Sequence, residues 1–103
     1  MSGAPERDAL VRAGAYLATR GLAPGTSGNI SLRLESGYLL TPTNSSLGSL
    51  DPSRLARLNE AGETVEGDPP TKEAALHLAM YRVRTDARAV VHMHAPHSVA
   101  LSC

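Results

Sequence analysis

The chain has 103 residues, of which 42% are hydrophobic, and its ten basic residues balance its ten acidic ones. This hydrophobic content can bury a core, which excludes a disordered chain and suits one small domain or a piece of a larger one. The neutral charge balance gives no reason to expect nucleic acid or an anionic membrane as a partner.

A cytoplasmic location is expected from three features of the sequence. The chain has one cysteine, Cys103, so it has no internal disulfide framework and fits a reducing compartment. Its first residues carry charges where a secretion signal needs an apolar stretch. No run approaches the roughly 18 apolar residues that indicate a membrane span.

The first half of the chain predicts a helix followed by a hairpin. Apolar residues recur at helical spacing over residues 5–20, and Gly21 stands where a C-cap glycine belongs. After a glycine-rich break, residues 29–34 alternate apolar and polar side chains, as a strand does. Residues 38–41 follow a short turn and are expected to pair back on that strand.

The second half predicts short strands, a helix and a longer strand. Residues 55–58 and 64–66 are expected to be strands, and a helix capped by Thr71 is expected to run to about Arg84. Residues 89–94 have the pattern of a buried strand, and Ser98 is expected to begin another helix. The interleaved elements predict an α/β (α+β) fold, with helices layered around a mainly antiparallel sheet.

His92-Met93-His94 is the sharpest chemical feature of the sequence. Residues two apart on a strand point to the same face, so both imidazoles can converge on one metal ion. The alternative, without a metal, is a pair of polar residues on a half-exposed strand. Two ligands are too few for a catalytic zinc site, so a third must come from elsewhere.

The other two histidines are weaker candidates. His97 follows Pro96 and leaves the strand, which makes it an awkward third ligand. His77 lies four residues after Glu73 and would share its helix face. Each is better explained as a polar residue that is hydrogen-bonded near the site or exposed at the surface.

Three segments could bind an anion. Thr71, Lys72 and Glu73 open the predicted helix, whose N-terminus attracts negative charge. Glu73 could act there as a general acid or base beside a metal, although acidic residues are also simply favoured in a first turn. The glycine-rich segment 25–29 and the polar segment 43–46 offer N–H, hydroxyl and amide donors, and each could equally be an ordinary turn.

The order of these segments resembles the class II aldolase/adducin family. Four blocks carry the resemblance: Gly-Thr-Ser-Gly-Asn-Ile-Ser-Leu-Arg, Leu-Leu-Thr-Pro-Thr-Asn, Pro-Thr-Lys-Glu with Leu-His-x-x-x-Tyr, and Ala-Val-Val-His-Met-His-Ala-Pro-His-Ser. The resemblance covers about residues 10–103, and it identifies residues 1–103 as the N-terminal part of a single domain of roughly twice this length. It implies that the third zinc histidine lies beyond this chain, and that 103 residues alone are inactive.

The resemblance also implies roles for individual residues. It makes Glu73 the catalytic acid/base, and His92 and His94 ligands of Zn²⁺ or another divalent metal. The substrate phosphate would be bound by residues from all three donor segments: Gly28, Asn29, Thr43, Asn44, Thr71 and Lys72.

The pairs Thr43-Asn44 and Thr71-Lys72 are most similar to the family's branch of 3-oxo-tetronate 4-phosphate decarboxylases. The expected activity is therefore a metal-dependent carbon–carbon lyase that releases carbon dioxide and dihydroxyacetone phosphate. A sugar-phosphate aldolase or epimerase, a non-catalytic adducin-like module and an inert truncated fragment remain open. The resemblance further implies a homotetramer when the domain is complete.

Overall fold

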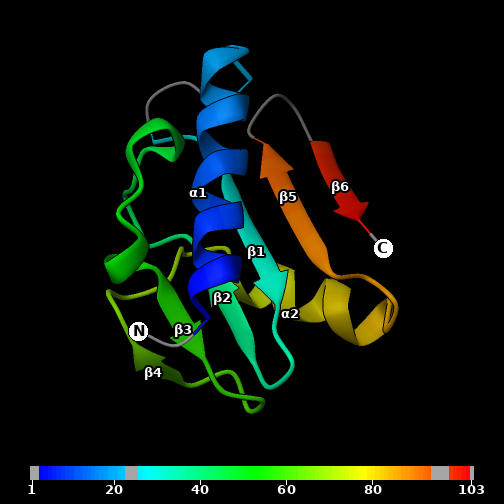
Figure 1. Ribbon diagram of the computed structural model, residues 1–103. Coiled ribbons are helices and arrows are strands. Elements are labelled where there is room, and N and C mark those ends of the chain that lie inside the picture. Colours follow the sequence, from blue (N-terminus) through cyan, green and yellow to red (C-terminus); the bar gives the residue numbers. More distant parts are fainter. Residues whose placement is uncertain (1–2, 23–25, 94–97, 103) are drawn as a thin grey trace.

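The structure is a computed structural model that describes residues 3–22, 26–93 and 98–102. Within these residues, six antiparallel strands form one sheet in the order β4-β3-β2-β1-β5-β6, and one α-helix lies on each face (Figure 1). The predicted fold class is confirmed. The elements in chain order are α1 (Ala4–Thr19), β1 (Asn29–Arg33), β2 (Tyr38–Leu40), the 3₁₀ turns η1 (Leu47–Ser49) and η2 (Pro52–Arg54), β3 (Ala56–Leu58), β4 (Thr64–Glu66), α2 (Ala74–Val83), β5 (Ala89–Met93) and β6 (Ser98–Ser102).

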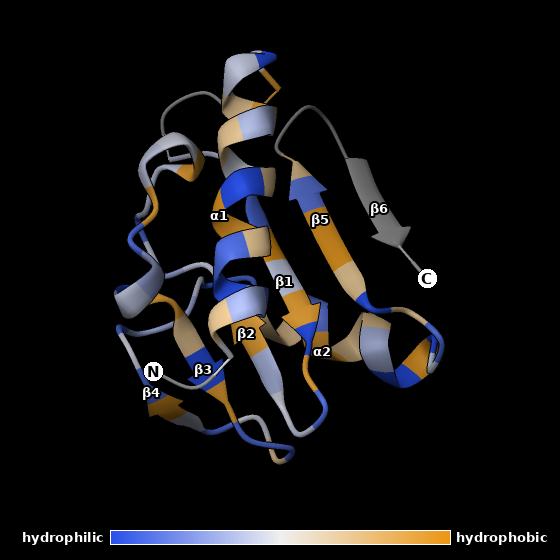
Figure 2. Ribbon diagram, in the orientation of Figure 1, coloured by the Kyte–Doolittle hydropathy of each residue, from blue (hydrophilic) through white to orange (hydrophobic). Residues whose placement is uncertain are grey.

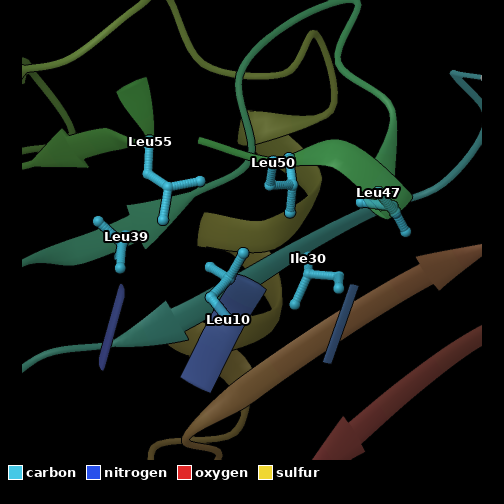
Figure 3. Packing of buried hydrophobic residues seen from close by; sticks show 6 residues of the cluster. All are labelled: Leu10, Ile30, Leu39, Leu47, Leu50 and Leu55. Atoms are coloured by element: carbon cyan, nitrogen blue, oxygen red, sulfur yellow. The ribbon is translucent and has the colours of Figure 1, made fainter. Parts of the chain in front are cut away.

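Helix α1 packs on one face of the sheet through aliphatic side chains. Leu10 of α1 meets Ile30 of β1 and Leu39 of β2, and leucines from η1 and its surroundings close the cluster (Figure 3). Hydrophobic residues along β1, β2 and β5 supply the sheet side of this layer (Figure 2). The cluster consists of Leu10, Ile30, Leu39, Leu47, Leu50 and Leu55.

Two residues fix how closely α1 approaches its neighbours. A Cβ on Gly14 would lie 2.6 Å from the backbone oxygen of Leu47, so only glycine fits this contact between α1 and η1. Arg7 is buried, and its guanidinium donates to Glu66 at 2.6 Å and to the carbonyl of Pro52 at 2.7 Å. The first turn of α1 is thereby joined to η2 and β4.

Helix α2 packs on the opposite face, and this face is partly polar. Leu78 of α2 contacts the cluster of Leu40, Ala56 and Leu58, while Tyr81 contacts Val90 of β5. Because side chains alternate along a strand, the residues of β1 between its apolar positions also point toward α2. Asn29 and Ser31 are therefore buried beneath this helix.

Two predicted elements differ from the structure. The segment from Ser98 is not a helix but strand β6, which pairs with all five residues of β5. This pairing satisfies backbone groups that β5 would otherwise leave bare at the sheet edge. The predicted helix at Thr71 begins later, at Ala74, because residues 71–73 form a turn first. Neither described helix reaches the length and hydropathy needed to cross a bilayer.

The contact at Gly14 can be tested by Gly14→Ala. Alanine normally stabilises a helix by about 1 kcal/mol relative to glycine. Here the added methyl meets the Leu47 carbonyl, and such overpacking costs about 1–3 kcal/mol. We expect a net loss in the free energy of unfolding, measured with urea. Ala13→Gly, at an exposed position of α1, is the control and should show the ordinary propensity penalty. A stabilised Gly14→Ala variant would contradict the packing described.

Candidate functional site

Four chain segments meet at one end of the sheet. Because β1 is antiparallel to both of its neighbours, its first residue lies beside the last residues of β2 and β5. Asn29 of β1 is the direct cross-strand partner of His92 of β5. The segment before α2 joins them, because the Thr71 N–H donates to the Thr41 carbonyl at 2.9 Å.

A cleft of about 290 Å³ opens where these segments meet. It brings together all the predicted site residues that the structure describes. His94 lies outside the described residues, as does His97, so the predicted histidine pair stays a prediction. The cleft is lined by Thr26, Ser27, Gly28 and Asn29 at the start of β1, Thr43 and Asn44 after β2, Thr71, Lys72 and Glu73 before α2, and His92 of β5.

The segment after β2 is held in a turn that suits asparagine. Asn44 has a φ of 58°, in the left-handed region that glycine and asparagine tolerate best. The turn is fixed by a hydrogen bond from the Thr43 N–H to the Pro69 carbonyl at 2.9 Å. Asparagine therefore suits this position better than most other residues with a side chain.

The segment before α2 presents charged and hydroxyl groups to the cleft. Thr71 caps the turn rather than the helix: its hydroxyl oxygen accepts from the Glu73 N–H at 3.2 Å. The Thr71 hydroxyl proton therefore remains able to donate to a ligand. Lys72 and Glu73 are both exposed at the mouth of the cleft.

Most side chains that line the cleft are hydrogen-bond donors. Four hydroxyls, two amides and the Lys72 ammonium contrast with Glu73, the one carboxylate among the described lining residues. Charge-assisted donors of this kind bind phosphate or carboxylate oxygens strongly. The cleft can therefore hold an anionic group and keep a single acid or base beside it.

His92 fits a metal ligand. Its Nδ1 is fully buried from solvent. Among the described residues, it is the one buried side-chain nitrogen or oxygen that has no hydrogen-bond partner. An unpaired polar atom in this position costs free energy unless a ligand satisfies it. Within residues 3–22, 26–93 and 98–102, no three His, Cys, Asp or Glu side chains gather to hold a metal unaided. A metal held by His92 would therefore need further ligands from outside these residues.

His77 lies behind the cleft rather than in it. Its Nδ1 is 2.6 Å from the Ser31 hydroxyl, and its Nε2 is 2.5 Å from Asn29 Oδ1. Burial, with a smaller contribution from His92, lowers the pKa of His77 to about 4. The preferred interpretation of His77, a hydrogen-bonded residue near the site, is thus confirmed. Ser31 and Tyr81 complete this buried group, and the sequence analysis did not predict them. Their spacing was the available signal: Ser31 shares a strand face with Asn29, and Tyr81 lies one helical turn after His77.

The model of the class II aldolase and adducin N-terminal domain matches residues 8–103. This match covers more than nine-tenths of the chain. The chain belongs to the class II aldolase and adducin family. The family match includes the residues of the six-stranded sheet and of the cleft.

Named relatives in the family include a decarboxylase and an aldolase. The 3-oxo-tetronate 4-phosphate decarboxylase of Escherichia coli K12 is 48% identical over 94% of this chain and 46% of its own length. The L-fuculose phosphate aldolase of the same strain is 43% identical over 80% of this chain and 38% of its own. The crystal structure of YgbL from Klebsiella pneumoniae is 41% identical, with a TM-score of 0.83 over 87% of this chain and 44% of that one. The chain thus spans about half the length of the relatives it matches.

Burial of neutral His77 predicts a pH dependence of stability. Its ordinary pKa of 6.5 applies in the unfolded chain, and the folded value is about 4. The unfolded state therefore binds more protons between these values, so stability is full above pH 6.5 and falls as the pH drops toward 4. The shift corresponds to a loss on the order of 3 kcal/mol.

Urea denaturation from pH 7 to pH 4 measures this loss. In the control, His77→Gln, the slope attributable to His77 should disappear, whatever the variant's absolute stability. An unchanged slope in His77→Gln would contradict a buried neutral imidazole.

Proposed function

We propose that the protein, at its natural length, is a metal-dependent carbon–carbon lyase that decarboxylates 3-oxo-tetronate 4-phosphate to dihydroxyacetone phosphate. The observation that carries the proposal is the cleft itself. Its hydroxyl, amide and ammonium groups form a wall of hydrogen-bond donors, called here the donor wall, beside one carboxylate, Glu73, and one histidine, His92. The similarity to relatives named for this reaction supports the choice of substrate.

The donor wall would bind the substrate phosphate. Backbone N–H groups near Gly28, the amides of Asn29 and Asn44 and the hydroxyls of Thr43 and Thr71 can each donate to a phosphate oxygen. Binding energy at the phosphate fixes the orientation of the reacting carbons. Lys72 adds a positive charge that can bind either the phosphate or the substrate carboxylate.

Glu73 would supply the proton that the reaction needs. When the bond between C1 and C2 of the substrate breaks, carbon dioxide leaves and the electron pair moves toward the C3 carbonyl oxygen. A proton must then reach C2 to give dihydroxyacetone phosphate. Glu73, the carboxyl group that lines the cleft, can deliver this proton as a general acid.

His92 and His94 would hold the divalent metal, Zn²⁺ or a similar ion. The unpaired Nδ1 of His92 supports this role, and two histidines at this spacing suit one ion if His94 continues the alternation of β5. When bound, the metal would act as a Lewis acid on the substrate oxygens. A third ligand would come from the remainder of the same domain.

The same proposal includes the wider setting of the chain. Residues 1–103 would form the N-terminal part of one class II aldolase domain, inactive without the rest, and the whole protein would be a cytoplasmic homotetramer. The match of this chain to 46% of the decarboxylase relative and 38% of the aldolase relative supports the partial domain.

A sugar-phosphate aldolase is the second candidate, favoured by the 43% identity to L-fuculose phosphate aldolase. Retro-aldol cleavage uses the same parts, because it too leaves a carbanion that needs a proton. Assays with 3-oxo acid phosphates and ketose phosphates, followed by carbon dioxide and aldehyde release, separate the two. Release of aldehyde alone would contradict the decarboxylase proposal.

The role of Glu73 is tested by Glu73→Gln, which keeps the size of the side chain and removes its proton. We expect kcat to fall by about 10²–10⁴-fold, the usual contribution of general acid–base catalysis. KM should change little, because the donor wall is intact. The control is Glu63→Gln, which should retain activity. Glu63 is an exposed carboxylate in the turn between β3 and β4 and does not line the cleft. Wild-type turnover in Glu73→Gln would exclude Glu73 as the proton donor.

The metal site is tested by His92→Ala in a zinc competition titration. Losing a hydrogen-bonded partner of a metal ligand typically weakens binding about 10–100-fold, and loss of a ligand itself should exceed this. His77→Gln is the matched control, because both nitrogens of His77 are occupied by protein groups. Equal zinc affinity in His92→Ala and the wild type would rule His92 out as a ligand.

A further inference from the structure

A linear chain of buried polar side chains runs behind the cleft. Tyr81 Oη lies 2.7 Å from Ser31 Oγ, which lies 2.6 Å from His77 Nδ1. His77 Nε2 then lies 2.5 Å from Asn29 Oδ1. All four residues are buried, and only Asn29 also lines the cleft. Ser31, His77 and Tyr81 do not line the cleft and are connected to it through Asn29.

The direction of these hydrogen bonds follows from the far end of the chain. Within the described residues, the Tyr81 hydroxyl has one hydrogen-bond partner, Ser31 Oγ, to which its proton can be donated. Tyr81 therefore donates its proton to Ser31, and Ser31 donates to Nδ1 of His77. The imidazole then carries its proton on Nε2 and donates it to Asn29 Oδ1.

The reverse direction would leave a buried proton unsatisfied. If Asn29 donated to His77, the imidazole would donate to Ser31, and Ser31 to Tyr81. The Tyr81 proton would then have no acceptor among the described residues. A buried hydroxyl proton without an acceptor costs about 1–3 kcal/mol, which is enough to fix the direction.

The direction determines which end of the Asn29 amide faces the cleft. Its Oδ1 is occupied by His77, so Nδ2 is the remaining polar atom. Within the described residues, Nδ2 has no hydrogen-bond partner. It is nevertheless accessible to solvent, because His92 Nδ1 is the one side-chain nitrogen or oxygen of these residues that is both fully buried and without a partner. Because Asn29 lines the cleft, its NH₂ group is the end that a ligand meets.

We propose that His77, Ser31 and Tyr81 are positioning residues that lock the Asn29 amide as a donor, so that this point of the cleft presents only a donor and suits an acceptor oxygen such as that of a phosphate. A free asparagine could rotate and offer Oδ1 to a hydroxyl group instead. The locked amide offers a ligand no acceptor at this point, and it keeps the lone pairs of Oδ1 away from an anion. This inference rests on the proposed phosphate-binding role of the cleft and assigns the buried residues behind it.

The first test is the tautomer of His77 in protein labelled with ¹⁵N-histidine. Long-range ¹H–¹⁵N spectra distinguish the two neutral tautomers, and comparison with His77→Gln assigns the signals. We expect the proton on Nε2 at pH 7. A proton on Nδ1 would overturn the inference, because Asn29 would then have to turn its NH₂ toward His77.

The second test measures the Kd of inorganic phosphate for the protein at its natural length. Asn29→Ala and His77→Leu should each weaken binding by about tenfold, the loss of one hydrogen bond to a charged group. His77→Gln should stay within about twofold of the wild type, because glutamine can still donate to Asn29. Leu58→Ala, in the core beneath α2, controls for lost stability and should leave the Kd unchanged.

The variants separate failure of the inference from failure of the proposed function. If Asn29→Ala leaves the phosphate Kd unchanged, the cleft does not use this amide and the inference is overturned, whereas a wild type that binds no phosphate would overturn the proposed function as well. If Asn29→Ala weakens binding while His77→Leu does not, phosphate binding stands and the positioning role is overturned. If Leu58→Ala weakens binding as much as His77→Leu, the effect is structural and the positioning role is likewise overturned.

Discussion

The pairing of Asn29 with His92 across β1 and β5 is the contact on which the site depends. Side chains directly opposite one another in an antiparallel pair lie about 5 Å apart at Cβ, on the same face. A slip of one residue would turn one of the two toward α1, because strand side chains alternate. The aliphatic cluster under α1 prevents such a slip, since Ile30 would leave the core (Figure 3).

The two faces of the sheet have different tasks. The α1 face is aliphatic and holds the register, and the α2 face buries polar groups that reach the cleft. A buried polar network stabilises a unique arrangement only when each member is satisfied, and a partly satisfied one is costly. The chain from Tyr81 through Ser31 and His77 meets this condition and ends at the ligand-facing amide.

The sequence predicted the parts whose signals are local. The strand over residues 29–34 and its hairpin partner follow from alternation and a turn, and the donor segments follow from residue type and order. The bond between Ser31 and His77 joins residues 46 apart, so no local pattern reveals it. Strand β6 was mistaken for a helix because five residues without their partner strand cannot show which period applies. The later start of α2 depends on the Thr71 turn, whose hydrogen bonds are tertiary.

The most direct test is a crystal structure of the protein at its natural length with inorganic phosphate and zinc, with anomalous data at the zinc edge. We predict phosphate in the cleft, within hydrogen-bonding distance of Asn29 Nδ2 and the Thr43 hydroxyl, and a zinc ion on His92. Phosphate bound elsewhere, or zinc held without His92, would contradict the account.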